Sequence, residues 1–436
     1  MTEHTPLPDD IGVTDDPDDP NEPHKPDGGT LRSHPRFLRL WLGQAGGAIG
    51  DQLLPVALSL YILREGGGAA DVGLVLAGRA IALVGCLLIG GVIADRLRRT
   101  RVLIGADCFR AVVLLATAVL LTRLPLGLLP VITALVGAGE ALSRPAYRSL
   151  VPTLLPDRLL ERGNALVSAA HRGSAVLGAI AGAAAVTLIG IRPALLITSA
   201  VFAFGAVAVL RVPEAARRTG HRAAILAEAA DGLRAIRRRP WVMVVMGTVC
   251  LHLFAGSATA LTLLPVIARD AFGGDIAYGY ILAAMGLGAL PAIAVAGHLR
   301  PKARGTVSMI ALTGYALLPL SLAGPLPLPL VMLCFAVGGF VVELYFVYWV
   351  SALQRAFPND QLGKVFALDQ LGAYALLPVG YLLVGPVVEL IGATATLVGG
   401  GVVVAVSSLL CLLVPGVARF ENTSSDTPPA IRPSLT

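Results

Sequence analysis

The chain has 436 residues, of which 55% are hydrophobic and only 14% are charged. Soluble globular proteins carry about 25% charged residues, so this composition excludes an ordinary soluble domain. The net charge of +6 does not indicate a nucleic-acid-binding protein, because the positive charges lie in short loops between apolar runs. The five cysteines lie inside these runs without regular spacing, so we expect no disulfide framework, no metal site and no cofactor.

Residues 1–35 are rich in Asp, Pro and Gly, and we expect a disordered acidic tail without a cleavable signal peptide. Apolar runs of about 17–27 residues follow, each long enough to cross a bilayer as a helix. Twelve spans are predicted: 37–63, 72–94, 102–121, 126–142, 165–189 and 193–210, then 241–267, 276–296, 306–322, 330–350, 365–388 and 393–414. The polar stretch 211–240 between the two sets predicts a surface helix around 223–238.

The connecting loops alternate in their content of Lys and Arg. One set holds 21 such residues and consists of 95–101, 143–164, 211–240, 297–305 and 351–364. The other set holds four and consists of 64–71, 122–125, 190–192, 268–275, 323–329 and 389–392. Because Lys and Arg are enriched in cytoplasmic loops, we expect the first set and both termini to lie in the cytoplasm, and the protein to lie in the cell membrane.

Short matches recur at an offset of 202 residues. Residues 156–162 align with 358–364, and the Leu-Ile-Gly at 188–190 aligns with that at 390–392. The repeat predicts an all-α membrane protein with two pseudo-symmetric six-helix bundles, at 36–211 and 241–415, and a binding cavity between them. We expect a basic linker at 212–240 and a cytoplasmic tail at 416–436.

An apolar run ends in one acid and four arginines over Gly91–Arg101. Its spacing, G-x-x-x-D-R-x-x-R-x-R, resembles the loop between helices 2 and 3 of major facilitator superfamily transporters. The segments FLRLWLGQ at 37–44, SRPAYRSLVP at 143–152 and NALVS at 164–168 are similar to the macrolide-efflux-like branch. The resemblance implies a twelve-helix major facilitator fold, alternating access, and export of hydrophobic drugs or secondary metabolites.

Two departures from the family pattern concern this loop and helix 5. Arg98 stands where the loop usually has Gly, and GAIAG at 178–182 lacks the Gly-Pro of the antiporter motif, which weakens the argument for antiport. The resemblance also implies that Asp95 faces the start of helix 11 near 363–365. The cytoplasmic gate loop would also include Gly91, Arg96, Arg99 and Arg101. Alternatively, these arginines only determine the orientation of the spans in the membrane.

Charged side chains inside a membrane are costly, so those within the spans need partners or water. Asp51 lies near the middle of the first span and is the leading candidate for binding a proton or a substrate cation. Arg79 on the second span has a similar depth, so the two can form a pair; a static structural pair is the alternative.

A second layer is expected nearer the cytoplasm. Asp107 and Arg110 are three residues apart and Glu140 and Arg144 are four apart, spacings that place each pair on one helix face. We expect an inner gate of switchable ion pairs or, alternatively, structural pairs.

Four further side chains in the second half and helix 5 are candidates. Glu343 and Asp369 have no obvious basic neighbour in the sequence, His252 can titrate near neutral pH, and Arg172 can hold an acid or an anionic substrate group. The rings at 345–349 are expected in the aromatic belt of the bilayer surface, with stacking on a drug as the alternative.

These features favour a monomeric secondary exporter of amphipathic or apolar small molecules that is driven by protons. No nucleotide-binding P-loop pattern is present, which argues against ATP as the direct energy source. An importer or facilitator of a nutrient or lipid is the alternative. An intramembrane enzyme is disfavoured because the sequence contains no catalytic motif. A membrane sensor is disfavoured because the sequence contains no long soluble domain.

Overall fold

The computed structural model describes residues 30–96, 98–210, 212, 225–299 and 301–421, without the side chains of 87–96, 157, 225–230, 359 and 360. Helices and short turns make up this part of the chain, and no strand occurs in it. The first half contains α1 (Pro35–Arg64), α2 (Ala69–Arg96), α3 (Arg99–Leu120), α4 (Leu129–Leu154), α5 (Asp157–Leu188) and α6 (Ile191–Val209). A short helix, α7 (Ile225–Arg237), follows in the basic stretch where a surface helix is predicted.

The helices of the second half are less regular. They are α8 (Pro240–Leu251), α9 (Ala258–Ala271), α10 (Asp275–His298), α11 (Arg304–Thr313), α12 (Leu317–Leu322), α13 (Leu328–Ala356), α14 (Asn359–Tyr374), α15 (Leu377–Ile391) and α16 (Ala393–Cys411). A π-helical turn, His252–Ser257, joins α8 to α9, and a 3-10 turn, Gly314–Ala316, joins α11 to α12. Three spans of this half therefore carry an interruption, at these two turns and between α14 and α15.

Eleven helical segments of the described chain are long and apolar enough to cross a membrane, which confirms the multi-pass helical class. The predicted fifth span, in α5, is not among them because polar residues such as His171 and Arg172 reach its middle. Helix α5 packs along α1 and α10. Because α5 is not among the eleven candidate spans, the twelfth crossing stays a prediction.

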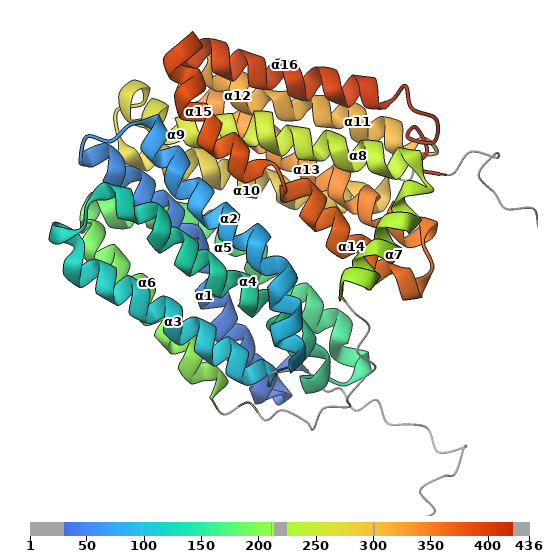
Figure 1. The fold of residues 1–436 in the computed structure, drawn as a ribbon, viewed down its shortest axis with the longest axis horizontal. Coiled ribbons are helices and arrows are strands. Elements are labelled where there is room, and N and C mark those ends of the chain that lie inside the picture. Colours follow the sequence, from blue (N-terminus) through green and yellow to red (C-terminus); the bar gives the residue numbers. More distant parts are fainter. Residues whose placement is uncertain (1–29, 97, 211, 213–224, 300, 422–436) are drawn as a thin grey trace, which may run out of the picture.

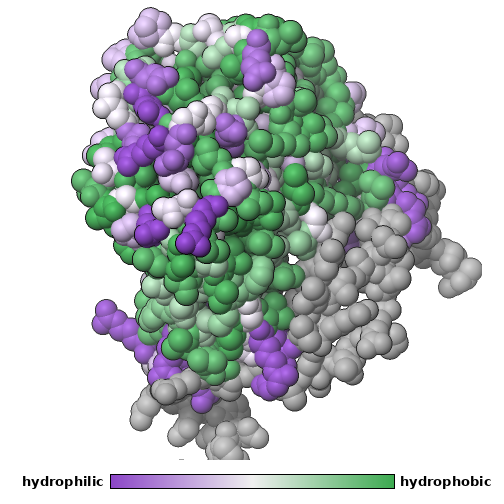
Figure 2. Space-filling model, turned by 60° about the vertical axis from the view of Figure 1, so that its left-hand side comes forward, coloured by the Kyte–Doolittle hydropathy of each residue, from purple (hydrophilic) through white to green (hydrophobic). Residues whose placement is uncertain are grey.

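Hydrophobic side chains cover most of the face in Figure 2, and hydrophilic ones gather in patches near its upper and lower parts. Large apolar side chains such as Val112, Val119 and Val207 are each more than 60% exposed. Such surfaces suit contact with lipid rather than with water.

The helices form two groups, α1–α6 and α8–α16, which approach each other at one end (Figure 1). The main contacts between the groups are made by α5 with α10 and by α2 with α15. At this end a single core contains residues from both groups, including Leu53, Ala183, Ile281 and Tyr381. The loops here belong to the set with few Lys and Arg.

At the opposite end each group has cores of its own. Leu103 and Leu150 belong to a core of the first group, whereas Trp241 and Trp349 belong to a core of the second. The two halves are thus joined by packing at the end with few basic residues and have separate cores at the basic end.

The junction depends on close helix approach at glycines. A Cβ added at Gly279 would lie 2.8 Å from the Cβ of Ala183, and one at Gly73 would lie 2.4 Å from the carbonyl oxygen of Tyr381. Small residues at helix contacts allow this approach in membranes, where packing rather than hydrophobic burial holds helices together.

The 202-residue repeat has a structural counterpart. Gly190 and Gly392 precede α6 and α16 with φ of +87° and +86°, a conformation that glycine adopts without strain. Pro156 and Pro358 likewise precede α5 and α14 with nearly the same backbone angles. Helix α14 begins at Asn359, which is earlier than the start near 363–365 used to place the partner of Asp95.

Two expectations about the second half need correction. Of the rings at 345–349, Tyr345, Tyr348 and Trp349 are buried rather than placed in an aromatic belt, and Trp349 packs edge-on against Trp241 and Phe420. Phe346 is 48% exposed, as a belt residue would be. The start of the polar tail is also part of the fold: Phe420 is 1% exposed and stacks on Trp241.

Gly288 tests whether close packing of α10 on α13 is essential. A Cβ there would lie 1.9 Å from the carbonyl oxygen of Ala336, whereas one at Gly297 on the same helix would meet nothing within 4 Å. We expect Gly288→Ala to lower the free energy of unfolding by about 1–3 kcal/mol, the usual cost of overpacking. Gly297→Ala should leave it nearly unchanged. Thermal unfolding of both purified variants in detergent measures this, and equal midpoints would contradict the packing argument.

Candidate functional site

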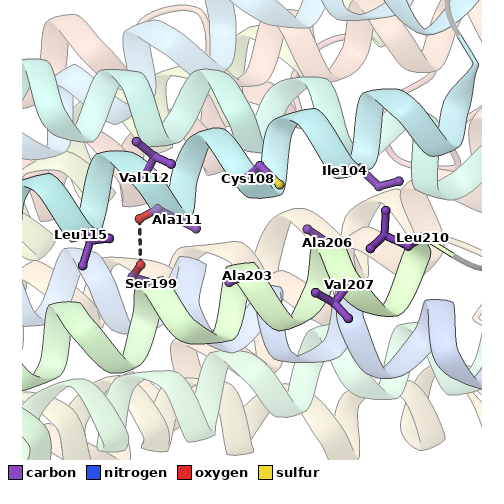
Figure 3. Close-up of a pocket in the computed structure, with 10 residues that line it drawn as sticks. All are labelled: Ile104, Cys108, Ala111, Val112, Leu115, Ser199, Ala203, Ala206, Val207 and Leu210. Atoms are coloured by element: carbon purple, nitrogen blue, oxygen red, sulfur yellow. Dashed lines mark hydrogen bonds between the residues drawn. The ribbon is translucent and has the colours of Figure 1, made fainter.

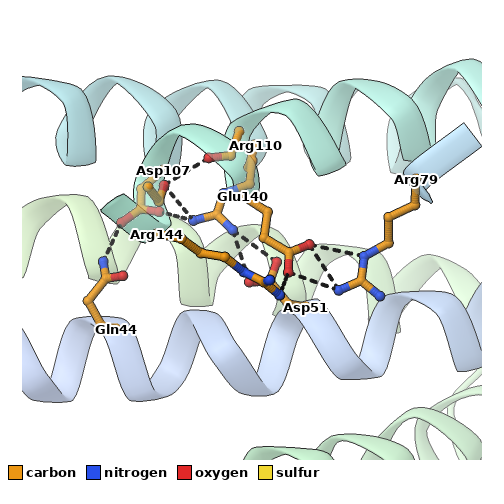
Figure 4. Close-up of polar contacts among 9 residues, drawn as sticks. Gln44, Asp51, Arg79, Asp107, Arg110, Glu140 and Arg144 are labelled. Carbon is orange, nitrogen blue, oxygen red and sulfur yellow. Dashed lines mark hydrogen bonds and ion pairs between the residues drawn. The ribbon is translucent and has the colours of Figure 1, made fainter. Parts of the chain in front are cut away.

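Arg110 is the centre of a buried charge network in the first half (Figure 4). It lies near the middle of α3 and is 2% exposed. One terminal nitrogen of its guanidinium donates to both carboxylate oxygens of Asp51 on α1, at 2.9 and 3.2 Å. The other pairs with Asp107 one helical turn away, and the Arg110 guanidinium carbon lies 4.1 Å from the ring centroid of Phe202. The positive charge of Arg110 is thus shared between two carboxylates, and its guanidinium group also lies over the face of an aromatic ring.

Glu140 on α4 is the centre of a second charge cluster, beside the first (Figure 4). Arg79 donates two hydrogen bonds to it, from Nε at 3.0 Å and from a terminal nitrogen at 3.1 Å. Arg144, one turn along α4, pairs with it as well. Glu140 is therefore paired with two guanidinium groups. The two parallel hydrogen bonds from Arg79 are a bidentate pair, which is the stronger form of this interaction.

The predicted pairs within α3 and within α4 are present, but the predicted Asp51–Arg79 pair is wrong. Asp51 pairs with Arg110 and Arg79 pairs with Glu140, because α2 packs closely on α4 and brings the two side chains together. The charges expected in two layers instead form two neighbouring clusters, one around Arg110 and one around Glu140, with three acids and three arginines in all. Among the described residues no ion pair joins the two clusters. Gln44 extends the Arg110 cluster by donating to Asp107 at 3.4 Å.

Arg172 and Glu343 form an ion pair between the two halves. They lie near the middle of α5 and α13, so the pair bridges the halves at mid-depth. The expectation that Glu343 has no basic neighbour is wrong, because its partner is 171 residues away in the sequence. No described donor reaches its other carboxylate oxygen, Oε1, which is buried.

Asp369 on α14 differs from the acids above because it pairs with no Lys or Arg of the described chain. Its Oδ1 accepts a hydrogen bond from the indole nitrogen of Trp349 at 3.1 Å. Trp349 in turn belongs to the aromatic cluster of Trp241, Tyr345 and Phe420. A carboxyl group in this setting can change its protonation state without breaking an ion pair.

His252 occupies the start of the π-helical turn and is 2% exposed. Its Nε2 lies 3.1 and 3.2 Å from the hydroxyl oxygens of Ser407 and Ser408 on α16. These contacts make it a hydrogen-bonded core residue; the two serines offered no sequence signal as its partners. The described residues contain no group of three His, Cys, Asp or Glu that could hold a metal ion.

The gate loop is described only in part. Gly91, Asp95 and Arg96 belong to the end of α2, but the side chains of Asp95 and Arg96 are not described, so their predicted contacts are not tested. Arg99 donates to the carbonyl oxygen of Ser149 on α4 at 2.7 Å, and Arg101 is exposed.

Sequence reasoning missed a second set of contacts between the halves, at the end where they share a core. Arg64 at the end of α1 pairs with Asp275 at the start of α10 at 2.6 Å. Arg269 of α9 donates to the carbonyl oxygen of Leu63. These residues lie at helix ends in weakly charged loops, where no spacing in the sequence marks them as partners.

A depression of about 360 Å³ between α3 and α6 lies apart from these charges (Figure 3). Its lining is almost entirely apolar, including Val112, Leu115 and Val207, and Ser199 donates to the carbonyl oxygen of Ala111. Because these side chains are on the lipid-facing surface, the depression is not a candidate for the polar chemistry of transport.

Comparison with known proteins places the chain among transporters. The family model for the Major Facilitator Superfamily matches residues 40–376. Macrolide efflux protein A of Streptococcus pyogenes is 22% identical over 408 residues, covering 88% of this chain and 97% of that protein. The multidrug efflux pump Tap of Mycolicibacterium fortuitum is 26% identical over 411 residues, covering 89% and 98%.

Solved structures show the same fold at lower identity. The nucleoside transporter NupG matches with a TM-score of 0.69 and 15% identity, covering 87% of this chain and 98% of that one. A POT family transporter in complex with 5-aminolevulinic acid matches with a TM-score of 0.68 and 15% identity, covering 88% and 96%.

Arg110 and Arg144 provide a matched test of the charge network. Removing Arg110 leaves two buried carboxylates without their shared cation, so we expect Arg110→Gln to destabilise the protein by about 3–5 kcal/mol. The side chain of Arg144 is 48% exposed, and Glu140 keeps Arg79, so Arg144→Gln should cost about 1 kcal/mol or less. Denaturant unfolding in detergent distinguishes the two, and similar losses would show that Arg110 is not the centre.

Proposed function

Because the chain belongs to the Major Facilitator Superfamily, a family of membrane transporters, we propose that it exports hydrophobic or amphipathic small molecules by proton-coupled alternating access. The observation that carries the proposal is the two neighbouring charge clusters, with three acids and three arginines in all, in the middle of the first half. Charges at this depth are costly and are kept where they serve proton or solute passage. The two efflux proteins among its relatives support the outward direction.

Alternating access needs two halves that separate at one face of the membrane at a time. The shared core at one end and the separate cores at the basic end fit a state open on the basic side. Since basic loops favour the cytoplasm, we infer that this side and both termini are cytoplasmic and that the chain lies in the cell membrane. We propose that it works as a monomer, with the cavity between its own halves.

Asp51 is the acid of the network that a proton would reach first. Its side chain is 16% exposed, whereas that of Asp107 is 2% exposed. Protonation of Asp51 would leave Arg110 paired with Asp107 alone and would break the ion pair between α1 and α3, leaving the hydrogen bond from Gln44 to Asp107 between these helices. One proton crossing the membrane potential supplies about 2.3 kcal/mol per 100 mV, which offsets part of the free energy needed to break one such ion pair. Asp369 is the second proton candidate, because its protonation breaks no ion pair.

An importer or facilitator is the second candidate function. The absence of the Gly-Pro motif at 178–182 favours it over antiport. Flux of a fluorescent drug into inverted vesicles separates the possibilities. Accumulation only with an acidic interior supports proton-coupled export. Equal flux with and without the gradient indicates a facilitator, and accumulation only in right-side-out vesicles indicates an importer.

Asp51→Asn should abolish the dependence of flux on the proton gradient, because an amide cannot exchange a proton with the cavity. Passive exchange of substrate across the vesicle membrane should persist, which shows that the variant is folded. Glu65→Gln, at the exposed end of the same helix, serves as the control and should behave as the unmodified protein does. Gradient-driven accumulation by Asp51→Asn would remove Asp51 from the coupling mechanism.

Asp95 is proposed as the carboxylate of the cytoplasmic gate, on the strength of the loop motif at 91–101. A carboxylate near the start of a helix gains about 0.3–1 kcal/mol from the helix dipole, and more when partly buried. Asp95→Ala should therefore reduce turnover several-fold while the amount of protein in the membrane stays the same. Initial rates in vesicles, normalised to immunoblots, measure this, and an unchanged rate would argue against the gate.

A further inference from the structure

Among the buried acids of the described spans, Glu343 has one carboxylate oxygen that accepts no hydrogen bond. Asp51, Asp107 and Glu140 each accept hydrogen bonds at both carboxylate oxygens. Glu343 accepts only at Oε2, from Arg172, while Oε1 is buried without any described donor within hydrogen-bond distance. A carboxylate oxygen in this position attracts a donor, because an unpaired buried acceptor is costly.

Glu343 lies between the halves, next to the apolar junction. On α5, Ala183, Ala179 and Val176 pack against glycines of α10, and Arg172 lies one turn further toward the basic end. The Arg172–Glu343 pair therefore lies at the edge of the apolar junction, on its basic side. The side chain of Arg172 is 28% exposed and that of Glu343 is 11% exposed, so the acid is approached past the arginine.

The carboxylate of Glu343 favours a positively charged ligand. A carboxylate is an acceptor only, and a charged donor forms a stronger hydrogen bond with it than a neutral one does. A neutral group could fill Oε1 but could not replace the charge of Arg172. The acids of the first half, by contrast, are already bonded to three arginines.

We propose that Glu343 binds the protonated amine of an otherwise apolar substrate, in competition with Arg172. The inference rests on the proposed export function and names its substrate class. The ammonium displaces Arg172 from Oε2, and a turn of the carboxylate then lets it donate to Oε1 as well, without any transfer of a proton. Since Arg172 and Glu343 belong to different halves, the substrate exchanges a contact between the halves for one to itself.

Binding to the purified protein tests this without a transport assay. Suitable probes are fluorescent dansyl-alkylamines of several chain lengths, each with its N-acetylated form, which has the same apolar body but no charge. We expect saturable binding of the amines at pH 7, at least 10-fold tighter than that of the acetylated forms. Equal affinities within each pair, or no saturable binding of any amine, would overturn the proposal.

The two members of the ion pair should have opposite effects. Glu343→Gln should weaken amine binding about 10-fold or more, which is the loss expected for a charge-assisted hydrogen bond. Arg172→Gln should tighten it several-fold, because the competitor for the carboxylate is gone. A purely structural pair would give losses in both variants, and that result would contradict the proposal.

Two further variants guard against misfolding. Glu343→Asp keeps the charge and should retain part of the preference for amines, whereas Glu389→Gln changes an exposed acid of α15 and should bind as the unmodified protein does. Amine binding without gradient-driven flux would refute the coupling and leave the site intact. Gradient-driven export of neutral and amine probes alike would instead refute the site and leave the export function intact.

Discussion

The structure depends on one electrostatic constraint: a charge in the interior of a membrane protein needs a partner. Asp51, Asp107 and Glu140 come from three helices, and each is paired with an arginine near the middle of the first half. These pairs tie α1 to α3 and α2 to α4. Such an arrangement couples the protonation of one carboxylate to the packing of two helices, because a change of charge at one member of a cluster alters the interactions of the others.

The two halves are built differently around their junction. The described helices of the first half are uninterrupted and carry the balanced charge network, whereas three spans of the second half contain a π turn, a 3-10 turn or a break. The second half also holds the less saturated acids, Glu343 and Asp369. Interrupted helices expose backbone groups and bend at low cost, so this half is suited to adjust around a ligand.

Contacts between the halves are of two physical kinds. At the end with few basic residues, glycines and alanines bring helices together in an apolar core, and Arg64 and Asp275 add an ion pair at the rim. At mid-depth the ion pair of Arg172 and Glu343 joins the halves. An apolar interface is stabilised by close packing over a large area. In an ion pair, by contrast, one member can be replaced by another group of the same charge. A transporter that opens and closes benefits from both kinds of contact.

The sequence by itself determined the helical membrane class, the positions of eleven of the twelve predicted spans and the pairs within one helix, such as Asp107 with Arg110. These follow from local rules, namely the length of apolar runs and the three- or four-residue spacing along a helix. Only the tertiary structure decided that Asp51 pairs with Arg110, that Glu343 meets Arg172, and that Trp349 is buried beside Phe420. The reason is physical: the rotation of each helix and its neighbours set which faces meet, and spacing along one chain does not contain that information.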